Sequence, residues 1–139
     1  MATIRYENAE DIKNKVELII KVLELKHINP ERVYCIRSHG SSSRGVIARC
    51  HSLPKIMQQV LAIEPVYIIE VISESFDKQS EEEKTKTLIH ELLHIPKTFG
   101  GGFLHHNFVT RAKIEKLYNK FKKLENSSLS SKNIVEQKI

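Results

Sequence analysis

The sequence lacks the features that mark membrane and secreted proteins. No apolar run approaches the roughly 20 residues that a membrane-spanning helix needs. The chain does not open with a basic segment followed by an apolar stretch, which is the pattern of a secretory signal peptide. Internal repeats are also absent. We therefore expect a cytoplasmic protein that has no membrane partner.

Cysteine is scarce as well. Only Cys35 and Cys50 are present, and they lack the close spacing of cysteine pairs that bind metal ions. Both fall in segments that we predict to be strands, where they could face each other across a hairpin. In a reducing compartment we expect two free thiols in place of a disulfide.

The chain has the length of one domain. Its 139 residues, of which 40% are hydrophobic, can build a single core but leave no room for a separate substrate-recognition module. The segment from residue 126 onward is polar and lacks helical periodicity. We therefore assign residues 1–125 to the domain and residues 126–139 to a mobile C-terminal tail.

One short motif in the sequence combines residue types that can bind a metal ion and transfer a proton. The chain reads His90-Glu91-Leu92-Leu93-His94, and side chains four residues apart lie on one face of a helix. His90 and His94 can therefore bind the same zinc ion, and Glu91 is placed to take a proton from a zinc-bound water. The capping box that begins at Ser80 predicts a helix that runs into the motif. This pattern indicates metal-assisted hydrolysis.

A third ligand has to come from further along the chain, because a catalytic zinc site needs three protein ligands and one open position. A histidine six residues after His94 is ruled out, since that position is Gly100. Pro96 ends the helix early, and the three glycines from Gly100 permit a turn that could return the chain to the metal. His106 is the preferred candidate for the third ligand, and His105 and Glu115 are two equal alternatives.

The first half of the chain predicts one helix and two strands. Asn8 is placed to cap an amphipathic helix that ends before Asn29. Strands are predicted over residues 32–37 and 46–50, joined by a Ser-rich loop over residues 39–45. This pair of strands would form a hairpin.

The second half predicts the rest of the fold. A short helix is expected over residues 54–61, with its apolar side chains facing inward. Residues 66–72 are almost all apolar, as is typical of a central strand, and a last amphipathic helix is expected over residues 108–124. Together with the motif helix, this order predicts an α+β domain in which that helix packs on one face of a small mixed sheet.

Most of residues 67–117 also resemble a known family. The extended signature His90-Glu91-Leu92-Leu93-His94-Ile95-Pro96 and the glycines before His106 resemble a metallopeptidase family of archaea and phages. That family is similar in turn to minimal zincins such as the SprT-like proteases. The resemblance implies a zincin-like fold, zinc-dependent hydrolysis and His106 as third ligand, since His106 matches a Gly-Gly-x-x-x-His pattern. His105 stands beside it, so the register of this ligand stays open.

The basic residues late in the chain raise the question of nucleic acid. The formal net charge is +5, and six cations gather near the C-terminus: Arg111, Lys113, Lys116, Lys120, Lys122 and Lys123. Few aromatic residues lie among them and no nucleic-acid motif is present, so a solvated helix face is favoured. SprT-like relatives act on DNA-bound proteins, so a DNA-associated substrate stays an alternative.

Several other polar residues have two interpretations. Glu70 interrupts the predicted central strand, and we expect it to face solvent in preference to orienting a metal-binding histidine. Arg44 and Arg49 could contact substrate or only solvate the hairpin. Three scattered histidines are expected to be ordinary structural residues, namely His27, His39 and His51.

Together these patterns predict a zinc metallopeptidase that acts on a peptide or protein substrate. Glu91 would be the general base, and His105 or a nearby tyrosine would stabilise the oxyanion. The Ser-rich hairpin is the expected edge along which substrate binds. The alternatives are a non-catalytic zinc-stabilised binding protein and a zinc-dependent hydrolase of nucleic acid. Glu91 favours the peptidase, because a structural zinc site needs a fourth ligand and no base.

Overall fold

A computed structural model describes residues 3–41 and 45–137, with side chains up to residue 127. The elements follow one another along the chain as β1 (Arg5–Asn8), α1 (Glu10–Val22), the 3-10 turn η1 (Pro30–Arg32), β2 (Val33–His39), β3 (Ala48–Ser52), α2 (Lys55–Leu61), β4 (Tyr67–Ile72), α3 (Ser73–Phe76), α4 (Glu81–Leu93) and α5 (Arg111–Gln137). This is the α+β composition that the sequence predicts.

Within residues 3–41 and 45–137, four strands form one mixed sheet with the order β1-β2-β4-β3. β4 is parallel to β2 and antiparallel to β3, and β1 is antiparallel to β2. β4 is central, as its apolar sequence predicts, because such a strand needs cover on both faces. β1 was not predicted. Asn8 belongs to it, so α1 is capped at Ala9 with no side-chain hydrogen bond, and the predicted Asn8 cap is wrong.

The predicted hairpin between β2 and β3 is also wrong. β4 lies between these two strands, so Cys35 and Cys50 are each opposite Ile69, one on either side of it. The two thiols are free, as expected. In the described part of the chain β3 is consequently an edge strand, with β4 as its neighbour on one side only. Ser42 to Arg44, the middle of the Ser-rich loop, lie outside the described residues.

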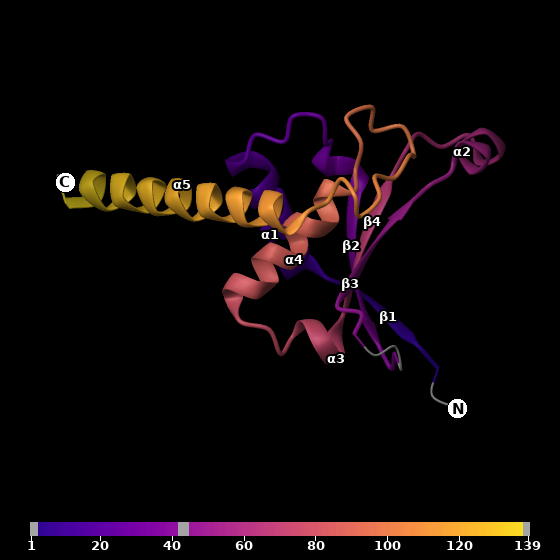
Figure 1. The fold of residues 1–139 in the computed structure, drawn as a ribbon, viewed down its shortest axis with the longest axis horizontal. Helices are drawn as coiled ribbons and strands as arrows, with labels where there is room; N and C mark the ends of the chain where they lie inside the picture. Colours follow the sequence, from indigo (N-terminus) through magenta and orange to yellow (C-terminus); the bar gives the residue numbers. More distant parts are fainter. Residues whose placement is uncertain (1–2, 42–44, 138–139) are drawn as a thin grey trace.

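The core lies between the sheet and the helices α1, α4 and α5 (Figure 1). α1 buries the apolar stripe that its sequence predicts, with Val16 and Ile19 completely covered. Leu88, Ile89 and Leu92 of α4 are buried in the same core cluster as Ile69 of the central strand. The face of α4 that carries these three residues fixes the direction in which the motif side chains point.

The two ends of the molecule depart from the prediction. α2 was expected to turn its apolar residues inward, yet Ile56 is 73% and Val60 is 75% exposed, so this prediction is wrong. The last helix was expected over residues 108–124. α5 instead begins at Arg111, where Thr110 Oγ1 accepts a hydrogen bond from Lys113 N–H, and its backbone is helical to Gln137. Figure 1 shows α2 and the C-terminal part of α5 at opposite ends. Within the described residues no helix is long and apolar enough to cross a membrane.

Candidate metal centre and cleft

Helix α4 presents the His-Glu-His motif from a fixed position. Ser80 Oγ accepts a hydrogen bond from Glu83 N–H at 3.2 Å, so the predicted cap is confirmed and the helix begins where expected. The helix ends at Leu93, and His94 follows it as the C-cap residue. His90 and His94 therefore still share a face one turn apart.

His106 joins these two histidines from a distant part of the chain. The ring centroids of His90 and His94 lie 5.0 Å apart, and His106 lies 5.3 Å from the first and 4.9 Å from the second. The potential ligand atoms of the three residues all fall within 4.8 Å of one another. Three imidazoles at this separation can hold one metal ion.

The return of the chain after α4 is fixed by contacts with His94. Leu104 N–H donates to the carbonyl oxygen of His94 at 2.8 Å, and Leu104 O accepts a hydrogen bond from His94 Nδ1. Phe103 stacks on the His94 ring, with centroids 4.4 Å apart and planes 10° apart. Because Nδ1 is engaged, His94 is left with Nε2 for a metal, in the tautomer that backbone acceptors commonly fix.

Two side chains that the sequence did not single out hold the glycine turn. Tyr67 of β4 donates its hydroxyl hydrogen to Gly102 O at 2.8 Å and accepts from Gly101 N–H at 3.0 Å. Gln58 of α2 donates to Gly100 O at 3.0 Å. Gly101 has φ +101°, and a Cβ there would lie 2.4 Å from Gln58 Nε2. Only the run of glycines signalled this turn in the sequence.

The surroundings of His90 and His94 lower the pKa of both imidazole rings. Burial, followed by the neighbouring His94 and His106, lowers the pKa of His90. Burial also lowers the pKa of His94, even though the hydrogen bond to Leu104 O opposes this shift. A lowered pKa favours the neutral imidazole, which is the form with a free lone pair for a metal ion.

Glu91 lies beside the histidines without belonging to their cluster. Its side chain is almost completely buried, and Glu91 Oε1 lies 3.9 Å from His90 Nε2. Burial raises the pKa of Glu91 to about 7. A carboxyl group with such a pKa can both accept and release a proton near neutral pH.

The other two candidates for the third ligand lie outside the histidine cluster. His105 is exposed and its ring stands edge-on to Phe103, with centroids 5.7 Å apart. Glu115 of α5 is engaged with Lys86 of α4, at 2.9 Å between Oε1 and Nζ. Among the described residues, only His90, His94 and His106 form a group spaced as metal ligands.

Glu70 differs from its prediction. It is 6% exposed, so it does not face solvent, and its Oε1 lies 2.8 Å from His51 Nε2. Arg49 Nη1 lies 3.6 Å from Glu70 Oε2. Glu70 is thus one member of a polar cluster on the sheet. Its partners come from a neighbouring strand, which sequence reasoning could not identify without knowing the strand order.

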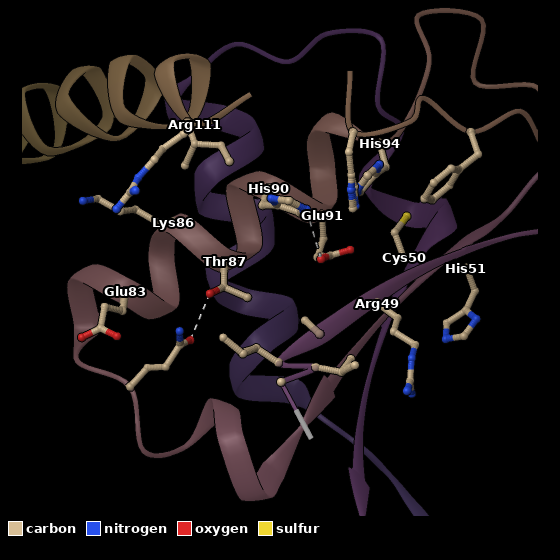
Figure 2. Close-up of a pocket in the computed structure, with 18 of the residues that line it drawn as sticks. Arg49, Cys50, His51, Glu83, Lys86, Thr87, His90, Glu91, His94 and Arg111 are labelled. Carbon is tan, nitrogen blue, oxygen red and sulfur yellow. Dashed lines mark hydrogen bonds and ion pairs between the residues drawn. The ribbon is translucent and has the colours of Figure 1, made fainter. Parts of the chain in front are cut away.

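A cleft of about 970 Å³ opens over the histidines. One wall is β3 with the residues before it, and the other is α4 with the start of α5. In Figure 2, His90 and Glu91 come from the helix, and Cys50 comes from the strand on the far side. Burial raises the pKa of Cys50 to about 12, with Glu91 adding to the shift, so this thiol stays protonated. The cleft gives a ligand access to the histidine cluster.

Comparison with protein families agrees with this geometry. Fold and site together define a small α+β protein with a histidine cluster suited to a metal ion. Residues 4–129 match the model of the family described as "Putative phage metallopeptidase", and the chain belongs to that family. Comparison with curated proteins and with solved structures gave no match.

Proposed function

We propose that the protein is a zinc-dependent peptidase with a zincin-like active site. The observation that carries the proposal is the convergence of three imidazoles beside a buried carboxylate in an open cleft, within a metallopeptidase family. His90, His94 and His106 are the proposed zinc ligands. Three nitrogen ligands suit zinc and leave one of its usual four positions for water.

The proposed chemistry divides between the ion and Glu91. When bound, zinc would supply a Lewis acid that polarises the scissile carbonyl and lowers the pKa of a water molecule. Glu91 accepts the proton of the attacking water and passes it to the nitrogen of the leaving amine. Its burial beside His90 supports this role, because a carboxylate in a poorly solvated site is a stronger base than one in water.

The proposed substrate is an extended peptide that lies along β3. Among the described residues this strand has a neighbour on one side only, and its residues from Ala48 to His51 line the cleft. A peptide can add to such an edge through backbone hydrogen bonds. His105 remains our candidate for stabilising the oxyanion, because the hydroxyl of Tyr67 is already engaged with the glycine turn.

Glu91→Gln separates catalysis from metal binding. The amide keeps the size of the side chain but cannot accept the proton, so we expect about one zinc per chain, an unchanged fold and a rate lower by on the order of 10² to 10⁴. The assay uses an unfolded protein and a mixed peptide library, with and without DNA. If wild type binds zinc yet cleaves neither, the binding-protein alternative gains support. Cleavage of RNA or DNA that depends on Glu91 would instead favour a nuclease.

The ligand set has its own test. His106→Ala should release zinc much more readily than His105→Ala or Glu115→Ala, with affinity measured by competition against a chelator. The latter two are matched controls because each removes a side chain that could coordinate a metal from beside the cluster. Loss of zinc from either control with retention by His106→Ala would contradict the assignment.

A further inference from the structure

Helix α2 exposes a group of apolar side chains that the core does not use. None of its residues is buried. The exposed apolar surface, which we call the α2 patch, comprises Ile56, Met57, Val60, Leu61 and Ile63. Contiguous apolar surface of this kind on a small protein usually marks an interaction site. A helix of seven residues also gains little stability by itself, so its position needs anchoring.

Gln58 provides this anchor and ties α2 to the segments that follow β3 and α4. Gln58 Nε2 donates to Leu53 O at 2.8 Å, just beyond the end of β3, and to Gly100 O at 3.0 Å, in the turn that leads to His106. Figure 1 shows α2 projecting past the strands, near the loop that follows α4. The α2 patch therefore continues the line of the edge strand along which we propose that substrate binds.

We propose that the α2 patch docks the part of a polypeptide substrate that extends beyond the C-terminal end of β3. The patch would favour unfolded substrates whose segment beyond β3 carries apolar side chains. The proposal rests on the proposed function, because it takes β3 as the substrate-binding edge. Ile56 follows His51 of the cleft by five residues, so it lies at most about 18 Å away. An extended substrate covers that span with about five or six residues.

Charge and size argue against two other occupants. From Pro54 to Ile63 the only charged residue is Lys55, whereas helices that bind anionic membranes carry several cations on their polar face. A second copy of the chain would need a larger surface, because a stable interface takes about 20 to 30 residues from each partner. Four side chains on one short helix, with Ile63 just after it, fit a single extended peptide better.

A binding measurement tests the docking without relying on catalysis. A fluorescent 16-residue peptide with three leucines in one half is titrated with metal-free protein, and fluorescence anisotropy gives its affinity. The double variant Ile56→Gln, Val60→Gln replaces two exposed side chains with a good helix former. We expect its affinity to fall about tenfold, in line with the loss of apolar burial. Tyr6→Gln, at an exposed position (63%) on β1, is the matched control and should bind like wild type.

Cleavage by the zinc-loaded enzyme gives a second measurement. Peptides are extended by a leucine-containing or a serine-containing segment on either side of the cleaved bond, and kcat/KM is compared. Wild type should prefer one leucine extension by about tenfold, and the α2 variant should reduce that ratio to about one. The favoured side also gives the direction in which substrate lies on β3.

The possible outcomes separate the two proposals. Cleavage with no α2-dependent preference, together with equal binding by wild type and variant, would overturn the docking surface but leave the peptidase. Binding through the α2 patch without any hydrolysis would support docking and count against the peptidase. If the variant changes only the sedimentation of the protein or its binding to phosphatidylcholine vesicles, the occupant is a second copy or a lipid surface, and the substrate role is wrong.

Discussion

Removing the hydroxyl group of Tyr67 should weaken metal binding at the candidate centre, although Tyr67 is not one of the proposed ligands. Tyr67 is completely buried in β4, and its hydroxyl both donates to Gly102 O and accepts from Gly101 N–H. Tyr67→Phe keeps the ring and creates no large cavity, so its effect comes from these two lost bonds. At about 0.5 to 1.5 kcal/mol for each hydrogen bond, the free energy of unfolding should fall by about 1 to 3 kcal/mol.

The same substitution should weaken zinc binding, because the glycine turn leads the chain back to His106. We expect a loss of affinity of about tenfold, the lower end of what contacts that orient metal ligands usually contribute. Denaturant titration without metal measures stability, and chelator competition measures affinity. Tyr34→Phe, at a half-exposed position on β2, is the control and should change neither value. Unchanged stability and zinc affinity in Tyr67→Phe would refute the role of this anchor.

Two further predictions concern stability. Gly101→Ala should lower the free energy of unfolding by at least about 2 kcal/mol, because φ is +101° and the new Cβ would lie 2.5 Å from a backbone oxygen. Gly100→Ala is the control and should be tolerated, because the nearest atom to its new Cβ is 3.8 Å away. Equal denaturation midpoints for the two variants would contradict this prediction. Burial opposes the ionisation of Glu70, but the hydrogen bond with His51, the nearby Ser38 hydroxyl and the positive charge of Arg49 outweigh it and lower the pKa below the ordinary 4.5. The ionised carboxylate therefore stabilises the fold fully above about pH 4.5, and this stabilisation disappears as pH falls through the folded-state pKa. Glu70→Gln should be less stable than wild type at pH 7 and should approach wild-type stability in acid. A difference in unfolding free energy that stays constant across the pH titration would contradict this prediction.

The parts of the structure that local chemistry determines were predictable from the sequence. The cap at Ser80 and the apolar face of α4 depend on residues within a few positions of each other, so the motif helix begins where predicted. The apolar run of β4 likewise identified the central strand. The glycines and Pro96 indicated a turn after the helix, and this turn does bring His106 to His90 and His94.

Features that depend on distant partners were not predictable. The sequence suggested a hairpin of β2 and β3, but β4 lies between them, because β2 pairs with β4 across more than 30 residues and β3 pairs with the other side of β4. Glu70 is buried because its partners come from other strands. The exposed position of α2 was missed for a similar reason: apolar residues predict burial only where another element covers them, and Gln58 attaches this helix through polar contacts.

A crystal structure of the zinc-loaded protein is the sharpest test of the proposed three-histidine site. We predict one ion about 2.0 to 2.1 Å from a ring nitrogen of each of His90, His94 and His106, with His94 binding through Nε2. The fourth position should hold water, and Glu91 should contact that water without binding the ion. A fourth protein ligand that closes the site, or an ion held by His105, Glu115 or Glu91 in place of His106, would contradict it.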